Sequence, residues 1–158
     1  MARLSFTGLE EFSDKISALG AGAEGMARMA LYDGAGVVAD ALRESVMSLP
    51  LTGRSGKPYE GLLPDDREDL ANGIGIAKFE TRGGSVTTSL GFNGYARRTE
   101  RKYPKGVPLA MLARSLESGS SVRAKHPFVR STVRRVKTAV QEAMAKRVQD
   151  TIKDTLEG

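Results

Sequence analysis

The sequence predicts an α+β fold: helices at both ends of the chain, one antiparallel β-hairpin between them, and a long C-terminal amphipathic helix. Two observations lead to this prediction. Apolar residues recur every three or four positions in the first part of the chain and again after Pro127, as on a helix with one buried face. Between these regions, two short runs alternate apolar and polar residues around a glycine pair, which is typical of a hairpin.

The length of 158 residues suits one domain with a buried core, and we expect a single domain over 1–158. The chain has no cysteine and one histidine, which excludes disulfides and disfavours a zinc site. No run approaches the roughly 18 apolar residues that span a bilayer. We therefore expect no metal, no cofactor and no membrane contact.

The N-terminal region predicts two helices. An apolar stripe from Leu9 to Leu19 indicates the first, which Gly20 is expected to end. The second is predicted from about Ala23 to Met47. Gly34 and Gly36 lie inside it, at a cost of about 1 kcal/mol each relative to alanine. These glycines predict either a kink or the close approach of another backbone, and we favour close packing.

A long loop is predicted from Leu51 to Leu70, because this stretch is rich in Gly, Pro and Asp. We expect Lys57–Asp69 to be mobile in a free subunit and ordered by a neighbouring molecule. Its apolar anchors are few: Tyr59, Leu62 and Leu63. Its acidic residues are expected to be solvated: Asp65, Asp66, Glu68 and Asp69.

Two runs with strand character follow the loop, Gly73–Phe79 and Ser85–Phe92. The Gly83-Gly84 pair between them indicates a tight hairpin turn. A basic loop over 93–106 comes next, and Pro108 suits the start of a short helix that stops near Ser118.

The C-terminal helix is predicted from Pro127 to about Thr155, because apolar residues repeat there at steps of 3 and 4. Four of its side chains are expected to face the core: Val133, Val136, Val140 and Met144. This helix is the most regular pattern in the sequence.

Charge is segregated along the chain. Residues 1–96 carry 9 Lys and Arg against 13 Asp and Glu, whereas residues 97–147 carry 14 Lys and Arg against 3 Asp and Glu. A basic stretch of this kind implies an acidic partner, which is either nucleic acid or a protein surface of opposite charge.

The candidate partner-binding residues belong to this basic stretch and to the loop. Arg130, Arg134 and Lys137 fall at steps of 4 and 3, so they share one row of the C-terminal helix. The full candidate set is Arg123, Lys125, Arg130, Arg134, Lys137, Tyr59, Leu62 and Leu63. Cations near a helix N-terminus oppose the helix dipole, so a partner explains them better than helix stability does.

Three interpretations of the basic row are open, in the order that charge and spacing favour them: a solvated surface, contact with an acidic protein, and contact with DNA. The row has no aromatic platform for bases and no Asn or Gln for base edges. Of the two partners we therefore predict an acidic protein surface.

No arrangement of residues predicts catalysis. His126 is the single imidazole and directly precedes Pro127 in a basic segment. The chain has neither a Gly-x-Ser-x-Gly elbow nor a phosphate-binding loop. Asp65 and Lys78 weakly suggest a metal-dependent nuclease, but Ile76 stands where the second metal-binding acid is needed. We expect no catalytic residues.

Three segments occur in a recognisable order: SLPLTGRSG at 48–56, LARSLESGSS at 112–121, and HPFVRST at 126–132. This order resembles the head–tail joining or tail-completion (neck) proteins of long-tailed double-stranded DNA phages. In that family a helix leads into an Ala-Pro-x-x-Thr-Gly turn and a strand hairpin. A Glu-x-Gly-Thr segment then precedes an Arg-Pro-Phe motif that opens the last helix. Here Leu49, Ser120 and His126 replace the Ala, the second Thr and the Arg.

The resemblance implies a structural virion protein: a homo-oligomeric ring, six-fold or twelve-fold, that completes the tail or joins it to the capsid. It implies a location at the head–tail junction or tail end, after assembly in the host cytoplasm. Neighbouring neck or tail proteins would be its partners, and double-stranded DNA would pass through the ring without sequence-specific contact. The alternative is a basic DNA-binding protein without enzymatic activity.

Overall fold

The computed structural model of the chain describes residues 13–51 and 61–157, with side chains described from residue 20 onward. Its helices are α1 (Ser13–Ser48), α2 (Pro64–Asn72), α3 (Leu109–Ser118) and α4 (Phe128–Glu157). Its strands are β1 (Ile74–Ile76), β2 (Glu80–Arg82), β3 (Ser85–Thr87) and β4 (Leu90–Phe92). The predicted α+β class and the long C-terminal helix are confirmed.

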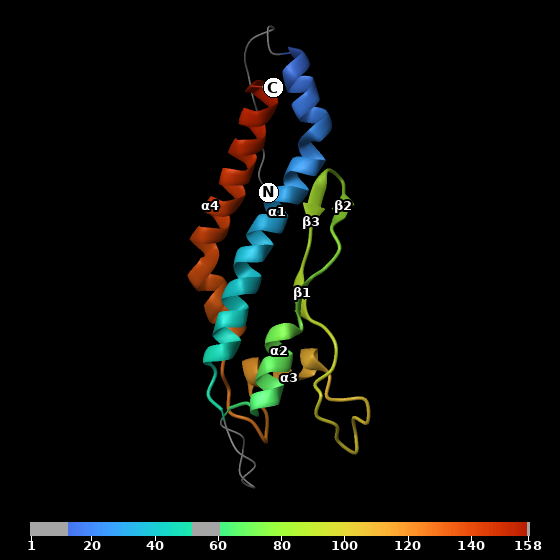
Figure 1. Cartoon of the computed structure of the whole chain (residues 1–158), viewed down its shortest axis with the longest axis vertical. Coiled ribbons are helices and arrows are strands. Elements are labelled where there is room, and N and C mark those ends of the chain that lie inside the picture. The colour runs from blue at the N-terminus through green and yellow to red at the C-terminus, as the bar shows by residue number, and fades with distance from the viewer. Residues whose placement is uncertain (1–12, 52–60, 158) are drawn as a thin grey trace.

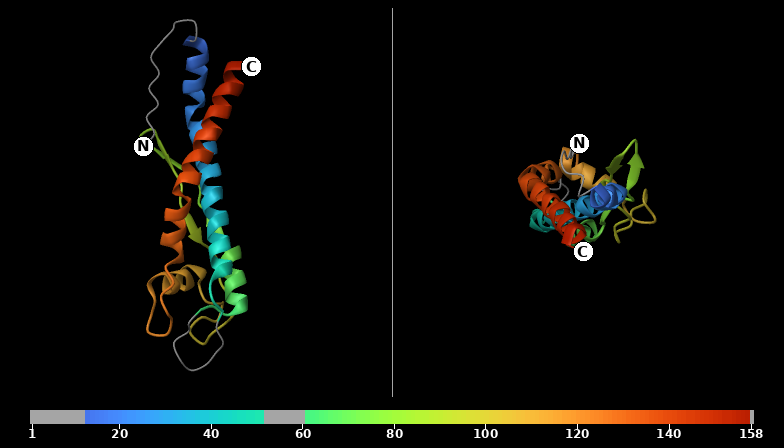
Figure 2. Two further views of the ribbon diagram at one scale, coloured as in Figure 1. Left: turned by 90° about the vertical axis from the view of Figure 1, so that its left-hand side faces the viewer. Right: turned by 90° about the horizontal axis from the view of Figure 1, so that it is seen from above.

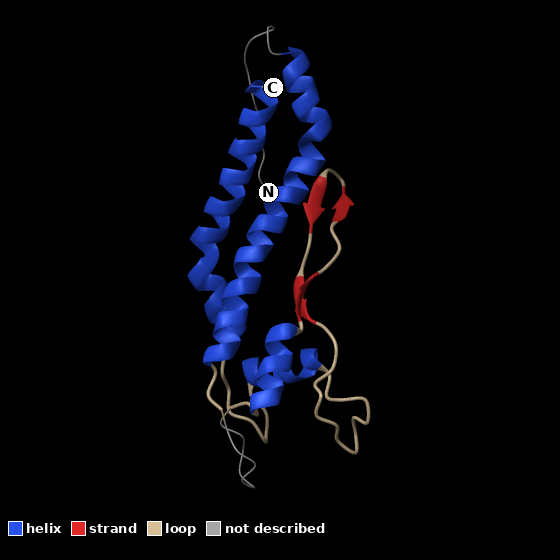
Figure 3. Cartoon of the chain, viewed as in Figure 1, coloured by secondary structure: helices blue, strands red, loops and turns tan. Residues whose placement is uncertain are grey.

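The molecule is elongated along α1 and α4, which run antiparallel beside each other and cross at a shallow angle (Figures 1 and 2). The short helices α2 and α3 gather at one end of this pair and form a base. The strands rise from the base along one side of α1 (Figure 3). Among the described residues, the hairpin covers one flank of the helix pair.

Helix α1 is continuous through Gly20, so the prediction of two separate N-terminal helices is wrong. A glycine ends a helix when it adopts a positive φ, and none of the glycines in α1 does so. Glycine in a helix interior costs stability without forcing a stop. The expected stripe from Leu9 to Leu19 lies in part outside the described residues and otherwise where side chains are not described.

Gly34 is closely packed, but side chains of α4 make the contact, so the expected approach of another backbone is wrong. A Cβ atom at Gly34 would lie 2.8 Å from Met144 Cγ and 3.2 Å from Val140 Cγ1, so α4 needs a glycine there. A Cβ atom at Gly36 would meet nothing within 4 Å. The second glycine therefore has no packing role within the described part of the chain.

Residues 64–72 form α2, so the prediction of a loop up to Leu70 is wrong in this stretch. Pro64 occupies the start of the helix, where its missing N–H costs nothing, and Asp65 and Asp66 in the first turn complement the helix dipole. Leu70 is buried in the core. Residues 52–60, which include Lys57 and Tyr59, lie outside the described residues.

The predicted hairpin is confirmed as two antiparallel strand pairs that follow one another, β1 with β4 and β2 with β3. Gly83 and Gly84 make its turn with φ values of 56° and 78°, which only glycine adopts easily. Ile76 pairs with Leu90 and Glu80 pairs with Thr87. Residues 77–79 therefore lie opposite residues 88–89, so a bulge separates the β1–β4 pair from the β2–β3 pair.

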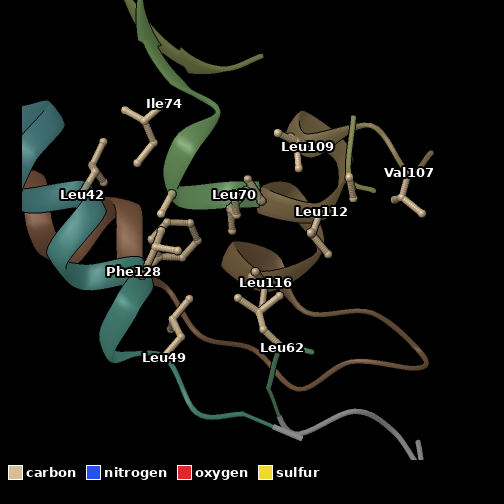
Figure 4. Close-up of a cluster of buried hydrophobic side chains, with 14 of the residues drawn as sticks. Leu42, Leu49, Leu62, Leu70, Ile74, Val107, Leu109, Leu112, Leu116 and Phe128 are labelled. Atoms are coloured by element: carbon tan, nitrogen blue, oxygen red, sulfur yellow. The ribbon is translucent and has the colours of Figure 1, made fainter. Parts of the chain in front are cut away.

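The core lies in the base, where side chains from every helix and from β1 point toward one another (Figure 4). Its largest fully buried apolar members are Leu62, Leu70, Leu116 and Val46. Phe128 opens α4 and packs edge-on against Phe92 of β4, with ring centroids 5.9 Å apart. Burial decreases along α4, where residues from Val140 onward are at most half-buried.

The inward face of α4 differs from the predicted one at one position. Phe128, Thr132 and Val136 are buried, while Val140 and Met144 are half-buried. Val133 is 46 % exposed, so its assignment to the core is wrong. The side chains that face inward follow steps of four: Phe128, Thr132, Val136, Val140 and Met144. Val133 lies beside this row and not in it.

Val136→Asp is predicted to lower the free energy of unfolding by about 3 kcal/mol, because it buries an unpaired charge against α1. The matched variant Val133→Asp should change it by no more than about 0.5 kcal/mol, since that side chain is exposed. Urea unfolding followed by circular dichroism measures both. Equal losses in the two variants would show that the inward face of α4 is assigned incorrectly.

A polar cluster attaches the β2–β3 end of the hairpin to α1. Thr81 of β2 donates a hydrogen bond to the Glu24 carboxylate at 2.8 Å and accepts one from Arg28 at 3.0 Å. Arg28 also pairs with Glu24 at 2.8 Å. The hydrogen bonds from Thr81 and Arg28 lower the pKa of Glu24.

Glu24→Ala is predicted to speed amide hydrogen exchange across Glu80–Thr87 while leaving exchange in the base unchanged. Asp154→Ala, which removes an exposed carboxylate of α4, serves as the control. Because the pKa of Glu24 is lowered in the folded state, its contribution is present above the unfolded pKa and is lost as pH falls through the folded value. Variant and wild type should therefore converge at low pH, and a difference that persists there would contradict this role.

Candidate functional site

The connection between α3 and α4 is a compact turn built by backbone contacts. The His126 N–H donates to the Leu116 carbonyl at 2.7 Å, which closes the segment between the two helices. Gly119 has a φ of 76°, and a Cβ atom there would lie 3.1 Å from Lys125 Cβ. A side chain at Gly119 would therefore strain the backbone and crowd the returning chain.

Glu117 joins the two helices directly. Its carboxylate accepts hydrogen bonds from the Val129 N–H at 2.8 Å and the Arg130 N–H at 3.1 Å. These groups belong to the first turn of α4, whose N–H donors have no partner within the helix. A carboxylate at this end also offsets the positive pole of the helix dipole. The last turn of α3 thus caps the first turn of α4.

The His-Pro-Phe segment at 126–128 has a structural role in this junction. The His126 backbone closes the turn, Pro127 precedes the helix, and the Phe128 ring is buried in the core. The sequence singled out this segment by its resemblance to a family motif, and the contacts show what it does locally. It fixes where α4 begins and which way the helix leaves the base.

The basic row lies beyond this junction on α4. Arg130, Arg134 and Lys137 are all exposed, as the sequence predicted, and Lys125 is exposed beside the turn. Within the described ranges, no carboxylate oxygen lies within 4.0 Å of the cationic groups of Arg130, Arg134 or Lys137. The structure therefore brings most of the predicted cations to one outward surface.

Arg123 differs from the other predicted cations because it is half-buried. Its guanidinium donates to the Gly61 carbonyl at 2.9 Å, which ties the α3–α4 turn to the segment before α2. This contact is part of the fold. The side chain is thus less available to a partner than its neighbours on α4 are.

The loop residues proposed as partner contacts are corrected by the structure. Leu62 is completely buried in the core, so its assignment to a partner surface is wrong. Leu63 is half-buried next to it. Tyr59 lies outside the described residues. Leu62 was misassigned because its Gly- and Pro-rich surroundings hide the fact that it returns to the base.

Val133 is the surface residue that the sequence analysis missed. It lies three residues after Arg130 and four before Lys137, so it belongs to the same outward face. Its β-branched apolar side chain fits the helical repeat, which is why the repeat assigned it to the core. One signal in the sequence was available: Thr132 lies four residues after Phe128 and four before Val136, which indicates that the inward row passes through Thr132 and not through Val133.

The prediction that the acidic residues of α2 are solvated is wrong for Asp66 and Asp69, which are paired and largely buried, whereas Asp65 and Glu68 are exposed. Asp66 is 1 % exposed, and its carboxylate forms an ion pair with the Arg98 guanidinium at 3.1 Å. Arg97 reaches both Glu68 and Asp69 at 2.8 Å, and these hydrogen bonds raise the pKa of its guanidinium. The start of the basic loop is therefore fastened to α2, and two of its cations are neutralised within the fold.

The geometry offers surfaces rather than an enclosed site. Over the described ranges, no three residues among His, Cys, Asp and Glu are grouped to hold a metal ion. In the same part of the chain, no helix is both long and apolar enough to cross a membrane. The hollow between α1 and α4 is open and polar, with Glu44, Ser45 and Arg135 among its lining residues.

Comparisons with known proteins return nothing: no family model, no curated protein and no solved structure matches this chain. The grounds for assigning a function are therefore its own residues, their geometry, and the resemblance of its three short segments.

Glu117→Ala is predicted to lower the free energy of unfolding by about 1–2 kcal/mol, because it removes the acceptor for two N–H groups of α4. Ser118→Ala, an exposed neighbour on the same helix, should have a much smaller effect. Chemical unfolding of both variants gives the comparison. Equal stability of Glu117→Ala and wild type would show that the carboxylate does not cap α4.

Proposed function

We propose that this chain is a structural virion protein of a phage or prophage, a ring component of the head–tail junction that completes the tail or joins it to the capsid. Its role is to be a subunit in an assembly rather than a catalyst. The proposal places it in the virion after assembly in the host cytoplasm, next to other neck or tail proteins.

One observation carries this proposal: the segments that resemble the neck family converge on one structural unit. Glu117 caps the helix that the His-Pro-Phe segment opens, and His126 bonds to the carbonyl of Leu116. Leu49, from the described part of the SLPLTGRSG segment, belongs to the same core cluster as Leu116 and Phe128. Such convergence supports the idea that the segments form a real motif rather than three chance similarities.

The shape of the molecule fits a role in a ring. A stiff pair of long helices presents charged faces outward, and the hairpin beside it is exposed along β2 (Figure 1). Exposed strand edges pair readily with other strands, and identical contacts repeated by rotation close a ring. We infer that double-stranded DNA passes through this ring without sequence-specific contact, because the basic row has no aromatic platform for bases and no Asn or Gln for base edges.

The proposal predicts that the purified full-length chain forms a homo-oligomer of defined mass, measured by native mass spectrometry. Antibodies against the chain should label particles at the head–tail junction or tail end under the electron microscope. Its affinity for duplex DNA should be weak. A monomer that binds duplex DNA tightly, with a steep loss of affinity as salt rises, would instead favour a stand-alone DNA-binding protein.

A further inference from the structure

Two outward faces of the helix pair carry opposite charge. The basic face, on α4, consists of Arg130, Val133, Arg134 and Lys137. The acidic face, on α1, consists of Asp40, Glu44 and Met47, and it also carries the exposed Arg43, which pairs with Asp40. Arg130, Arg134 and Lys137 follow steps of four and three, Val133 lies three residues after Arg130 and four before Lys137, and the acidic face follows steps of four and three, so each set occupies one side of its helix. Each face combines charged residues with one exposed apolar side chain.

The basic face points away from its own fold. Thr132 and Val136 turn inward on the same stretch of α4, which leaves the basic face on the outer side. Val133 is 46 % exposed among three cations that have no carboxylate within 4.0 Å in the described part of the chain. An apolar side chain contributes nothing to binding phosphates, whereas it contributes contact area to binding a protein. This favours a protein partner over nucleic acid.

The acidic face is similarly open. The side chains of Asp40 and Glu44 are 81 % and 76 % exposed, and Met47 is 46 % exposed. Leu42 and Val46 on the same stretch of α1 face the core. Asp40 pairs with Arg43 three residues later, and Glu44 reaches Arg135 at 3.9 Å. Exposed pairs of this kind contribute little, so both carboxylates remain available to stronger partners.

The two faces lie at the same level along the helix pair, and no ion pair joins them in the described part of the chain. The contact between Glu44 and Arg135 sets this level, because α1 and α4 run antiparallel there. Arg135 belongs to a different row of α4 from Arg130, Arg134 and Lys137, since it lies one residue beyond Arg134 and so about 100° around the helix. The basic face therefore lies on another side of α4 from the contact with Glu44, where it is exposed to another molecule.

We infer that the basic face of one copy docks on the acidic face of a second copy, with Arg134 and its neighbouring cations opposite Asp40 and Glu44 and with Val133 against Met47. Two different surfaces meet in this contact, so it is heterologous and repeats from copy to copy. The inference rests on the proposed ring and names the surfaces that hold it together. It also explains why two apolar side chains stay exposed among charges.

Charge reversal tests the contact in the full-length chain. Arg134→Glu and Glu44→Arg should each weaken self-association at least about tenfold, because each places like charges together. The double variant carries both changes in every copy and should regain most of the loss. Lys146→Glu, the same charge change on another row of α4, is the control and should associate like wild type. Sedimentation velocity over a concentration series gives the association constants, and thermal unfolding checks that each variant is folded.

Val133→Lys separates a second copy from DNA as the partner. This variant adds a cation to the basic face and removes its apolar side chain. Self-association should therefore fall about as much as in Arg134→Glu, whereas binding of the chain to a 20-base-pair duplex should stay equal or increase. Unchanged self-association in Arg134→Glu and Val133→Lys would overturn the inference. The proposed ring would then be held together by other surfaces. A wild-type chain that labels the head–tail junction yet stays monomeric would overturn it too. If the chain oligomerises through these faces but is absent from particles, the proposed function fails and the contact stands.

Discussion

The capping of α4 by Glu117 is the interaction on which the arrangement of the molecule depends. Two backbone N–H groups of the first turn of α4 are bound by a carboxylate from the last turn of α3. The cap fixes the start of a 30-residue helix, and Phe128 anchors that start in the core. Because a long helix amplifies any change of angle at its origin, this small junction sets the position of α4 against α1 and so the outward faces of both.

Charge in this protein serves two purposes that the sequence alone does not separate. Arg97, Arg98 and Arg123 bind carboxylates or a carbonyl of the same chain and hold loops to the base. Arg130, Arg134 and Lys137 remain outside and unpaired in the described ranges. Net charge therefore overstates the surface offered to a partner. The outward cations are fewer, but they are aligned on one rigid helix beside an apolar residue.

The sequence predicted the elements with strong local signals. Regular apolar spacing predicted α4, and the Gly83-Gly84 pair predicted the hairpin turn. Its failures arose where tertiary contacts decide. Composition suggested a loop where Pro64 begins α2, and Gly20 suggested a stop inside a continuous helix. The cations of α4 lie on the surface as predicted. Leu62 was expected on the surface and is buried, whereas Val133 was expected in the core and is exposed, because burial depends on contacts with residues distant in sequence.

The most direct measurement uses the absence of cysteine from the natural sequence. A chain carrying Val133→Cys and Met47→Cys has its two thiols on the basic and acidic faces, which meet between copies if the inferred contact is correct. Mild oxidation should then give a ladder of cross-linked multiples of the chain that ends at the closed ring. A chain with Val133→Cys and Tyr32→Cys, which places the second thiol elsewhere on α1, should not. Absence of the ladder, or equal cross-linking in both chains, would contradict the account.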